Sequence, residues 1–481
     1  MTQLTPTTPT NVPADRPLGG PERLFEWLNP FGGATHVVIA AIDTAIEDEH
    51  LRAALTHLQH KHPTLRAHIR SDRQGTLRFM PQQNPTVDFS RRDEDPLEIA
   101  HQWLDAGFDT HTDAPLWRVA ACRGQPLTLV MAFHHALEDG RSSVAFIRQL
   151  LTCCGLLAAS KPLPPASPRP MLPALDDMLP GKLGWGARLR FIVREAFRRF
   201  VPPVMLTEDP EATWSQRRTR LRTLNLSEET TGALVAACRR HKTTVQGALS
   251  AAMLIAAAQT HPSGKPLWMS CDANVDLRAS CSPPVSGDAI GLLIGSVSWM
   301  FRVAPSEPFW PLANMVRMRL AQMLDRGDPI DSMRLVDWVN FKPEWIATSA
   351  TVSHGRQQTT FVSNLGRVRQ TPHLTHVHYA TAQHGLGACF WVGAATVEGR
   401  LNLTFAYVPP LVKDIDAFVG RFEAALKAAL NKGLPPPVSA AKSRMLPAAE
   451  SQSDDAQADD AQADESHNDA AQRTAGNSSQ G

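Results

Sequence analysis

The feature that most constrains this chain is an apolar segment that runs into two adjacent histidines, in LTLVMAFHHALEDGRSS from Leu127 to Ser143. Its first seven residues contain no charge, glycine or proline, which predicts a buried β-strand. Asp139 and Gly140 follow the histidines, and a segment with helical spacing comes next. Polar groups at the end of a buried strand suit a functional site better than a core contact.

The histidine pair, His134 and His135, predicts proton transfer at this strand end. Successive strand residues point to opposite faces, so only one of the two can face a given cavity. A neutral imidazole can take a proton from a hydroxyl or an amine, since its ordinary pKa is about 6.5. Asp139 would serve better as a brace for the turn, paired with an arginine. Gly140 permits a close approach or a backbone angle that a side chain would forbid.

Other interpretations of the same residues are less favoured. A covalent acyl-enzyme is disfavoured because the chain shows no G-x-S-x-G elbow and no well-placed Cys-His pair, so direct transfer is expected. A metal site built from His134, His135 and Asp139 is disfavoured because adjacent histidines diverge and no third group of ligands lies nearby. The remaining alternative is a histidine pair that only satisfies the end of a core strand.

Composition limits the class of protein. The 481 residues exceed one ordinary core, so two domains or lobes are expected. A net charge of +1 gives no electrostatic case for nucleic acid. No apolar run reaches the length of a membrane span, and the first residues lack the apolar core of a signal peptide. The seven cysteines show no metal-binding spacing and indicate reduced thiols, so a cytoplasmic location is expected.

The motif HHALEDG, residues 134–140, resembles the HHxxxDG signature of the condensation-domain and chloramphenicol-acetyltransferase-like acyltransferases. Residues 51–69 resemble the opening helix of that superfamily and its exit, and residues 108–122 resemble the strand beside the motif strand. The resemblance covers roughly residues 15 to 433. It implies an α/β fold of two chloramphenicol-acetyltransferase-like lobes, each a mixed sheet with flanking helices. The lobes would form a V with the active site at their junction.

The same comparison and the local composition predict five segments. Residues 1–15 are rich in Thr and Pro and should be disordered. Residues 16–159 form the first lobe, with the motif. Residues 160–215 hold a Pro-rich crossover and a basic amphipathic helix. Residues 216–433 form the second lobe, and residues 434–481 are an acidic, low-complexity tail without the apolar residues needed for a core.

Three interpretations are open for the basic helix predicted within residues 185–203, which lies in the segment GWGARLRFIVREAFRRFVPP. It would lie on a membrane or lipid particle, or it would contact an acidic carrier protein. The favoured interpretation is plainer: the helix packs on the body through its apolar side and presents a solvated basic face.

Two segments of the second lobe add candidate residues through the resemblance. Arg278, in VDLR, matches the position whose arginine pairs with the motif aspartate, so it should pair with Asp139. The sequence SNLG, typical of the alcohol acetyltransferase, wax synthase-like and polyketide-associated branches, places Ser363 and Asn364 at a predicted strand end. Either would donate a hydrogen bond to a developing oxyanion or orient the acceptor. The alternative is an asparagine that caps a turn.

Together these residues predict an acyltransferase that uses an acyl thioester and an alcohol or amine acceptor. His135 would remove the proton of the acceptor, His134 would pack behind it, and Gly140 would give the donor room. Ester formation is favoured. The alternatives are a free-standing condensation enzyme that forms an amide or ester, and a non-catalytic member that binds a carrier or lipid. The co-substrate would be acyl-CoA or an acyl-phosphopantetheine carrier, with an acyl carrier protein as a candidate partner. No bound cofactor and no metal are expected.

Overall fold

A computed structural model describes residues 15–82, 85–124, 126–166, 170–208, 212–339, 344–345, 348 and 355–431. By their internal contacts, residues 1–433 form one unit and residues 434–481 another. The disorder predicted for residues 1–15 and 434–481 falls, except for Asp15, outside the described residues.

The first sheet has the motif strand at its centre. It has five strands in the order β12-β2-β7-β6-β5. The motif strand β7 is central and antiparallel to both neighbours, and only β5 and β6 run parallel. The bounds are Thr35–Ile42 for β2, Phe89–Arg92 for β5, Trp117–Cys122 for β6, Leu127–His134 for β7 and Leu374–Thr381 for β12. The predicted motif strand is confirmed and includes His134.

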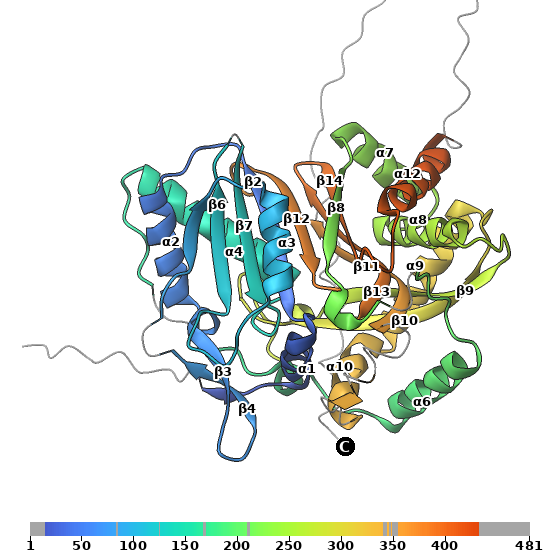
Figure 1. The fold of residues 1–481 in the computed structure, drawn as a ribbon, viewed down its shortest axis with the longest axis horizontal. Helices are drawn as coiled ribbons and strands as arrows, with labels where there is room; N and C mark the ends of the chain where they lie inside the picture. Colours follow the sequence, from blue (N-terminus) through green and yellow to red (C-terminus); the bar gives the residue numbers. More distant parts are fainter. Residues whose placement is uncertain are drawn as a thin grey trace, which may run out of the picture. The chain divides into compact units, whose positions relative to one another are not determined.

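Helices cover this sheet on two sides (Figure 1). The helix after the motif, α4, packs through Phe146 against Trp117 and Phe133 of the sheet. It also contacts α2, while α3 contacts β2 and β7. The bounds are Asp48–Lys61 for α2, Pro96–Ala106 for α3 and Gly140–Ala158 for α4. A short helix α1, Gly20–Leu28, precedes β2.

The second sheet has six strands in the order β10-β9-β11-β13-β14-β8, with β11 parallel to both neighbours and the other pairs antiparallel. The strands are Arg220–Asn225 (β8), Leu267–Asp276 (β9), Ile294–Val303 (β10), Arg356–Arg367 (β11), Gly387–Val397 (β13) and Arg400–Tyr407 (β14). The apolar helix α8 is buried almost all round against α9, α12 and β11. The remaining helices here are Glu228–Arg240 (α7), Val245–Thr260 (α8), Phe309–Asp325 (α9), Asp328–Trp338 (α10) and Ile415–Asn431 (α12).

These two mixed sheets with flanking helices confirm the predicted α/β fold class. A small third sheet pairs β1, β4 and β3 (Arg16–Pro17, Leu77–Pro81 and Ala67–Ser71). The later part of the chain also contributes to the first sheet, because β12 pairs antiparallel with β2 along its whole length. In sequence, β12 lies between β11 and β13 of the second sheet. The second lobe therefore contributes one strand, β12, to the sheet of the first lobe. The segment boundaries predicted from the sequence did not indicate this.

The crossover contains a short helix α5, Leu175–Met178, and the basic helix α6, Trp185–Phe200 (Figure 1). The structure differs from the favoured interpretation of α6 in one respect, because several of its large apolar side chains are exposed in addition to Arg190 and Arg199. Trp185 is 74% exposed and Phe200 is 85% exposed, whereas Arg194 and Arg198 are only partly exposed. Among the described residues, no helix combines the length and the apolar character that crossing a membrane would require.

Candidate active site

His135 lies directly after β7 and has a fixed hydrogen-bonding pattern. Its Nδ1 lies 2.7 Å from the carbonyl oxygen of Glu138, which can only accept a hydrogen bond. Nδ1 must therefore carry a proton, which leaves Nε2 as the unprotonated nitrogen of the neutral ring. The backbone N–H of His135 donates to the Ala34 carbonyl at 2.7 Å, which holds the residue against the neighbouring strand.

The His135 ring lies between two other rings. The ring centroid of Phe25, in α1, lies 4.2 Å from that of His135. The His36 ring, in β2, stacks on the His135 ring with centroids 5.0 Å apart and an interplanar angle of 17°. Burial, together with the nearby His36, lowers the pKa of His135 to about 3. The ring is therefore neutral near pH 7, as a proton acceptor must be.

His134 points away from that cavity, as strand alternation predicts. The Ala136 N–H donates to its Nδ1 at 3.2 Å, so the proton of the neutral ring lies on Nε2. Nε2 is 3.2 Å from a carboxylate oxygen of Glu26, although the angles are poor for a hydrogen bond. Phe108 contacts the ring edge to face. His134 is thus a packed residue behind the candidate base.

Asp139 caps α4 and pairs with Arg278 across the two lobes. The guanidinium donates to both carboxylate oxygens, at 3.0 and 3.1 Å. The backbone N–H groups of Ser142 and Leu293 donate to the same carboxylate at 2.9 and 2.8 Å. Burial alone would raise the pKa of Asp139, but Arg278 and these hydrogen bonds outweigh it and hold the pKa below its ordinary value. The pairing that the resemblance implied is present.

Ser142 extends this brace and was not singled out from the sequence. Its Oγ accepts from Arg278 at 2.8 Å and donates to the Gly291 carbonyl at 2.8 Å. The first turn of α4 is therefore joined to residues 291–293, which precede β10. Its position three residues after Asp139 was the available signal, since small hydroxyl residues in a first turn often form local hydrogen bonds.

Gly140 begins α4 and lines the cavity in front of His135. A Cβ at this position would lie 2.9 Å from a Leu365 methyl group, which is closer than ordinary contact. The close approach that the sequence suggested is therefore present, whereas the backbone angle is ordinary, because Gly140 is not among the positive-φ residues.

The cavity in front of His135 is small, about 110 Å³, and both sheets contribute to it. From the first sheet and its helix come His36, His135, Gly140 and Tyr379; from the second come Asn274, Asp276, Ser363 and Asn364. The structure thus brings Ser363 and Asn364 to the same cavity as His135. His134, Asp139 and Arg278 do not line it.

The strand that carries Ser363 and Asn364 differs from its prediction. β11 continues to Arg367 instead of ending at Ser363–Asn364, with an irregular register between Asn364 and Arg367. Gly366 has a φ of 71° there, which favours glycine. Asn364 Oδ1 accepts from the Gly366 N–H at 2.9 Å, and the Tyr379 hydroxyl donates to the Ser363 carbonyl at 2.6 Å.

Beside His135 lies a buried polar network that sequence reasoning missed. His36 Nδ1 is 2.5 Å from one carboxylate oxygen of Glu138, and Ser143 Oγ donates to the other at 2.5 Å. Burial raises the pKa of Glu138, against the lowering effect of His36. Glu138 occupies an unspecified position of the motif, and His36 becomes a neighbour only once β2 is paired with β7.

Among the described residues, one group of histidine and acidic side chains has its ligand atoms close enough together to hold a metal ion: His36, His135 and Glu138. Two ligand atoms on one zinc ion lie about 3.3 Å apart, given bonds of about 2.0–2.1 Å in a tetrahedron. The 2.5 Å separation of His36 and Glu138 is a hydrogen-bond distance instead. The group is therefore described as a hydrogen-bonded network.

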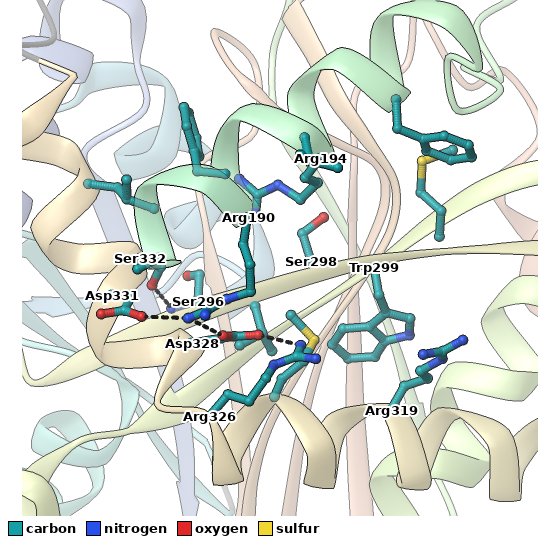
Figure 2. A pocket seen from close by; sticks show the side chains of 18 of the residues that line it. Arg190, Arg194, Ser296, Ser298, Trp299, Arg319, Arg326, Asp328, Asp331 and Ser332 are labelled. Carbon is teal, nitrogen blue, oxygen red and sulfur yellow. Dashed lines mark hydrogen bonds and ion pairs between the residues drawn. The ribbon is translucent and has the colours of Figure 1, made fainter. Parts of the chain in front are cut away.

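A larger cavity of about 710 Å³ lies beneath α6, between that helix, β10, α9 and α10 (Figure 2). Arg190 reaches from α6 to Asp331 at 3.0 Å and Asp328 at 3.3 Å. Ser296 of β10 lines this cavity, and its hydroxyl donates to Asn274, which lines the small cavity, at 2.9 Å. One hydrogen-bonded cross-strand pair thus lies between the two cavities.

Two models of known protein families match successive stretches of the chain. A model of the condensation domain matches residues 34–177. A model of the phthiocerol/phthiodiolone dimycocerosyl transferase C-terminus matches residues 215–405. The chain is thus similar, over two successive stretches, to the condensation-domain and chloramphenicol-acetyltransferase-like acyltransferases. The two matches follow each other along this acyltransferase and together include the motif, Arg278 and β11.

Individual relatives are distant in sequence. A phthiocerol/phthiodiolone dimycocerosyl transferase of Mycobacterium sp. (strain JLS) is 22% identical over 307 residues, or 62% of this chain and 70% of the relative. Polyketide synthase associated protein 5 from Mycobacterium tuberculosis superposes with a TM-score of 0.61 at 16% identity, over 87% of this chain and 99% of its own. Trichothecene 15-O-acetyltransferase from Fusarium sporotrichioides gives 0.69 at 10% identity, over 89% and 97%.

Proposed function

We propose that this acyltransferase moves an acyl group from a thioester to a hydroxyl acceptor by direct attack. The observation that carries the proposal is the His135 geometry: Nδ1 is committed to the Glu138 carbonyl, and the ring lines a cavity that both sheets share. The acceptor oxygen bonds to the thioester carbonyl carbon while Nε2 takes its proton. The carbon–sulfur bond then breaks, and the proton passes from Nε2 to the thiolate, which leaves as a thiol.

The opposite wall of the cavity supplies candidate donors for the negative charge that develops on the carbonyl oxygen. Ser363 Oγ lies 3.1 Å from the Tyr379 hydroxyl, whose one hydrogen is donated to the Ser363 carbonyl at 2.6 Å, so the Ser363 hydroxyl can donate to the Tyr379 oxygen or to a substrate. The Asn364 amide nitrogen is the second candidate, because the Oδ1 of that side chain is occupied by the turn. We assign these residues to the oxyanion or the acceptor.

The donor in this proposal is acyl-CoA or an acyl-phosphopantetheine carrier, and no bound cofactor or metal takes part. An ester product is favoured by the names of two similar proteins. Trichothecene 15-O-acetyltransferase is named for transfer to oxygen, and phthiocerol/phthiodiolone dimycocerosyl transferase is named for transfer to a phthiocerol or phthiodiolone. The larger cavity under α6 supports a substrate with a long hydrocarbon chain, since its volume is in the range of sites for large ligands.

A second candidate is a free-standing condensation enzyme that joins a carrier-bound acyl group to an amine. The match of the condensation-domain model to residues 34–177 favours it, because those residues include the whole motif. The same base and cavity would serve either acceptor. The acceptor therefore decides between the two candidates.

The test is thiol release from acyl-CoAs of short to long chain, each mixed with alcohols or with amines. We expect release that depends on an alcohol and an ester product by mass spectrometry. Amide product from amines alone would support the condensation enzyme. Activity only with acyl-phosphopantetheine carrier proteins would identify the donor, whereas no transfer from any of these donors would contradict the proposal.

The lowered pKa of His135 predicts an unusual pH profile. Because protonation would remove the base only near its pKa of about 3, kcat/KM should show no fall caused by His135 between about pH 8 and about pH 5. The measurement is kcat/KM for one donor and acceptor pair across this range. A fall with an apparent pKa near 6.5 would mean that the base titrates as an ordinary histidine.

A further inference from the structure

The helix α6 presents an unusual surface, because many of its large apolar side chains are exposed to solvent. Six of its large apolar side chains are between 43% and 85% exposed: Trp185, Leu189, Ile192, Val193, Phe197 and Phe200. Apolar side chains on a surface helix normally face the core. A contiguous exposed apolar face of this kind marks a contact with something outside the chain.

The spacing shows that these side chains form one face. At about 100° per residue, all six fall within an arc of about 140° on the helix. Arg199 lies at one edge of this arc and Arg190 at the other, and both are exposed. Leu189, Val193 and Phe197 also line the open cavity between α6, β10, α9 and α10. Trp185, Ile192 and Phe200 do not line it, and the buried Ala187 lies on the opposite side of the helix.

Contacts on the inner side hold α6 in this orientation. Arg190 pairs with Asp328 and Asp331, as Figure 2 shows. Phe191 packs edge to face on Trp338 of α10 at 6.1 Å, and the Arg188 guanidinium lies 5.6 Å from the centre of the same Trp338 ring. The outward apolar face is therefore supported by several contacts beneath it.

The charge of the helix points to one kind of partner. Its sixteen residues contain five arginines and one acidic residue, Glu195. Arginine can lie along an apolar surface through its methylene groups while its guanidinium reaches phosphate groups at the edge. Aromatic and aliphatic side chains on one face with arginines beside them are the features of helices that lie in a membrane interface. Anionic headgroups would add electrostatic attraction.

The end of the chain offers little to cover this face. Residues 434–481 contain very few large apolar side chains, so burial against them would remove little apolar surface from water. We propose that α6 lies flat in an anionic lipid surface, with its exposed apolar side chains inserted and the exposed Arg199 at the phosphates. This docking does not depend on the proposed reaction. It would bring the cavity beneath α6 close to the lipid, where a long-chain substrate is found.

The test is co-sedimentation of the full chain with vesicles of phosphatidylcholine, with and without phosphatidylglycerol. We expect binding to the anionic vesicles that weakens with salt. Ile192→Glu/Phe200→Glu, which changes two exposed residues that line neither cavity, should weaken it by about tenfold or more, because two large side chains no longer leave water. The control, Met315→Glu/Met318→Glu, changes two exposed apolar residues of α9, which are 42% and 50% exposed, and should leave binding unchanged.

Thiol release with a short, soluble acyl-CoA separates this proposal from the proposed function. The α6 variant should match wild type in that assay, because none of its substitutions lines the cavity at His135. No binding to anionic vesicles, or equal loss in both double variants, would overturn the proposal. So would a fall in molar mass by light scattering from dimer to monomer in the α6 variant, which would assign the face to a second copy of the chain.

Discussion

Replacement of His135 by Ala should lower kcat by about 10²- to 10⁴-fold, the range that general acid–base catalysis contributes. The effect should be on kcat more than on KM, because the base acts on the proton in the transition state. The neighbouring His36 lines the same cavity, and its Nδ1 lies 2.5 Å from the Glu138 carboxylate, which holds its ring in place. The measurement is steady-state thiol release with the preferred donor and acceptor.

Two companion variants make this result interpretable. His135→Gln keeps a side chain that can donate to the Glu138 carbonyl but provides no base, so it should be as inactive as His135→Ala. His373→Ala replaces an exposed histidine far along the chain and should behave as wild type. Near-normal thiol release by His135→Gln with a normal melting temperature would show that His135 is not the base.

Replacement of Arg278 by Ala should destabilise the fold by about 3–5 kcal/mol, because it leaves the buried Asp139 carboxylate without its charge partner. The contribution of the ionised Asp139 to the stability of the wild-type chain should be nearly constant between about pH 8 and about pH 5. The pKa of Asp139 lies below its ordinary value in the folded chain, so its ionised form contributes stability that is lost only as the pH falls through that low pKa. Thermal and denaturant unfolding at several pH values measure this.

Asp139→Asn distinguishes a brace from a catalytic acid. It removes the charge but keeps the size of the side chain, so it should reduce stability and activity together. Arg148→Ala is the matched control, because its ion pair with Asp288 joins α4 to the same neighbouring segment near the surface and should contribute about 1 kcal/mol or less. A stable, well-folded Asp139→Asn variant without activity would place Asp139 in the chemistry instead.

Features that depend on local pattern were predictable from the sequence. The motif strand, the helix after it and the buried helix α8 follow from the apolar pattern, and two of the three match closely in their bounds. The divergence of His134 and His135 followed from strand geometry alone. The pairing of Asp139 with Arg278 came from the resemblance, since nothing local connects residues so distant in the chain.

Features that depend on strand register or on orientation were not predictable in this way. His36 contacts His135 because β2 pairs with β7, a register that no local pattern contains. Periodicity showed that α6 has an apolar face, but it did not show that this face stays largely exposed while part of it lines the cavity beside the helix. The course of β11 past Asn364 depends on Gly366, whose left-handed backbone keeps the strand paired beyond the predicted end.

The exchange of β12 between the sheets has a consequence for the chain during synthesis on the ribosome. The first sheet needs residues 374–381 at its edge, so it remains incomplete until about four fifths of the 481 residues have been translated. Until then β2 is an unpaired sheet edge, which is a template for pairing with other chains. The nascent first lobe therefore depends on a strand that arrives last, and chaperone protection of that edge would matter most in this interval.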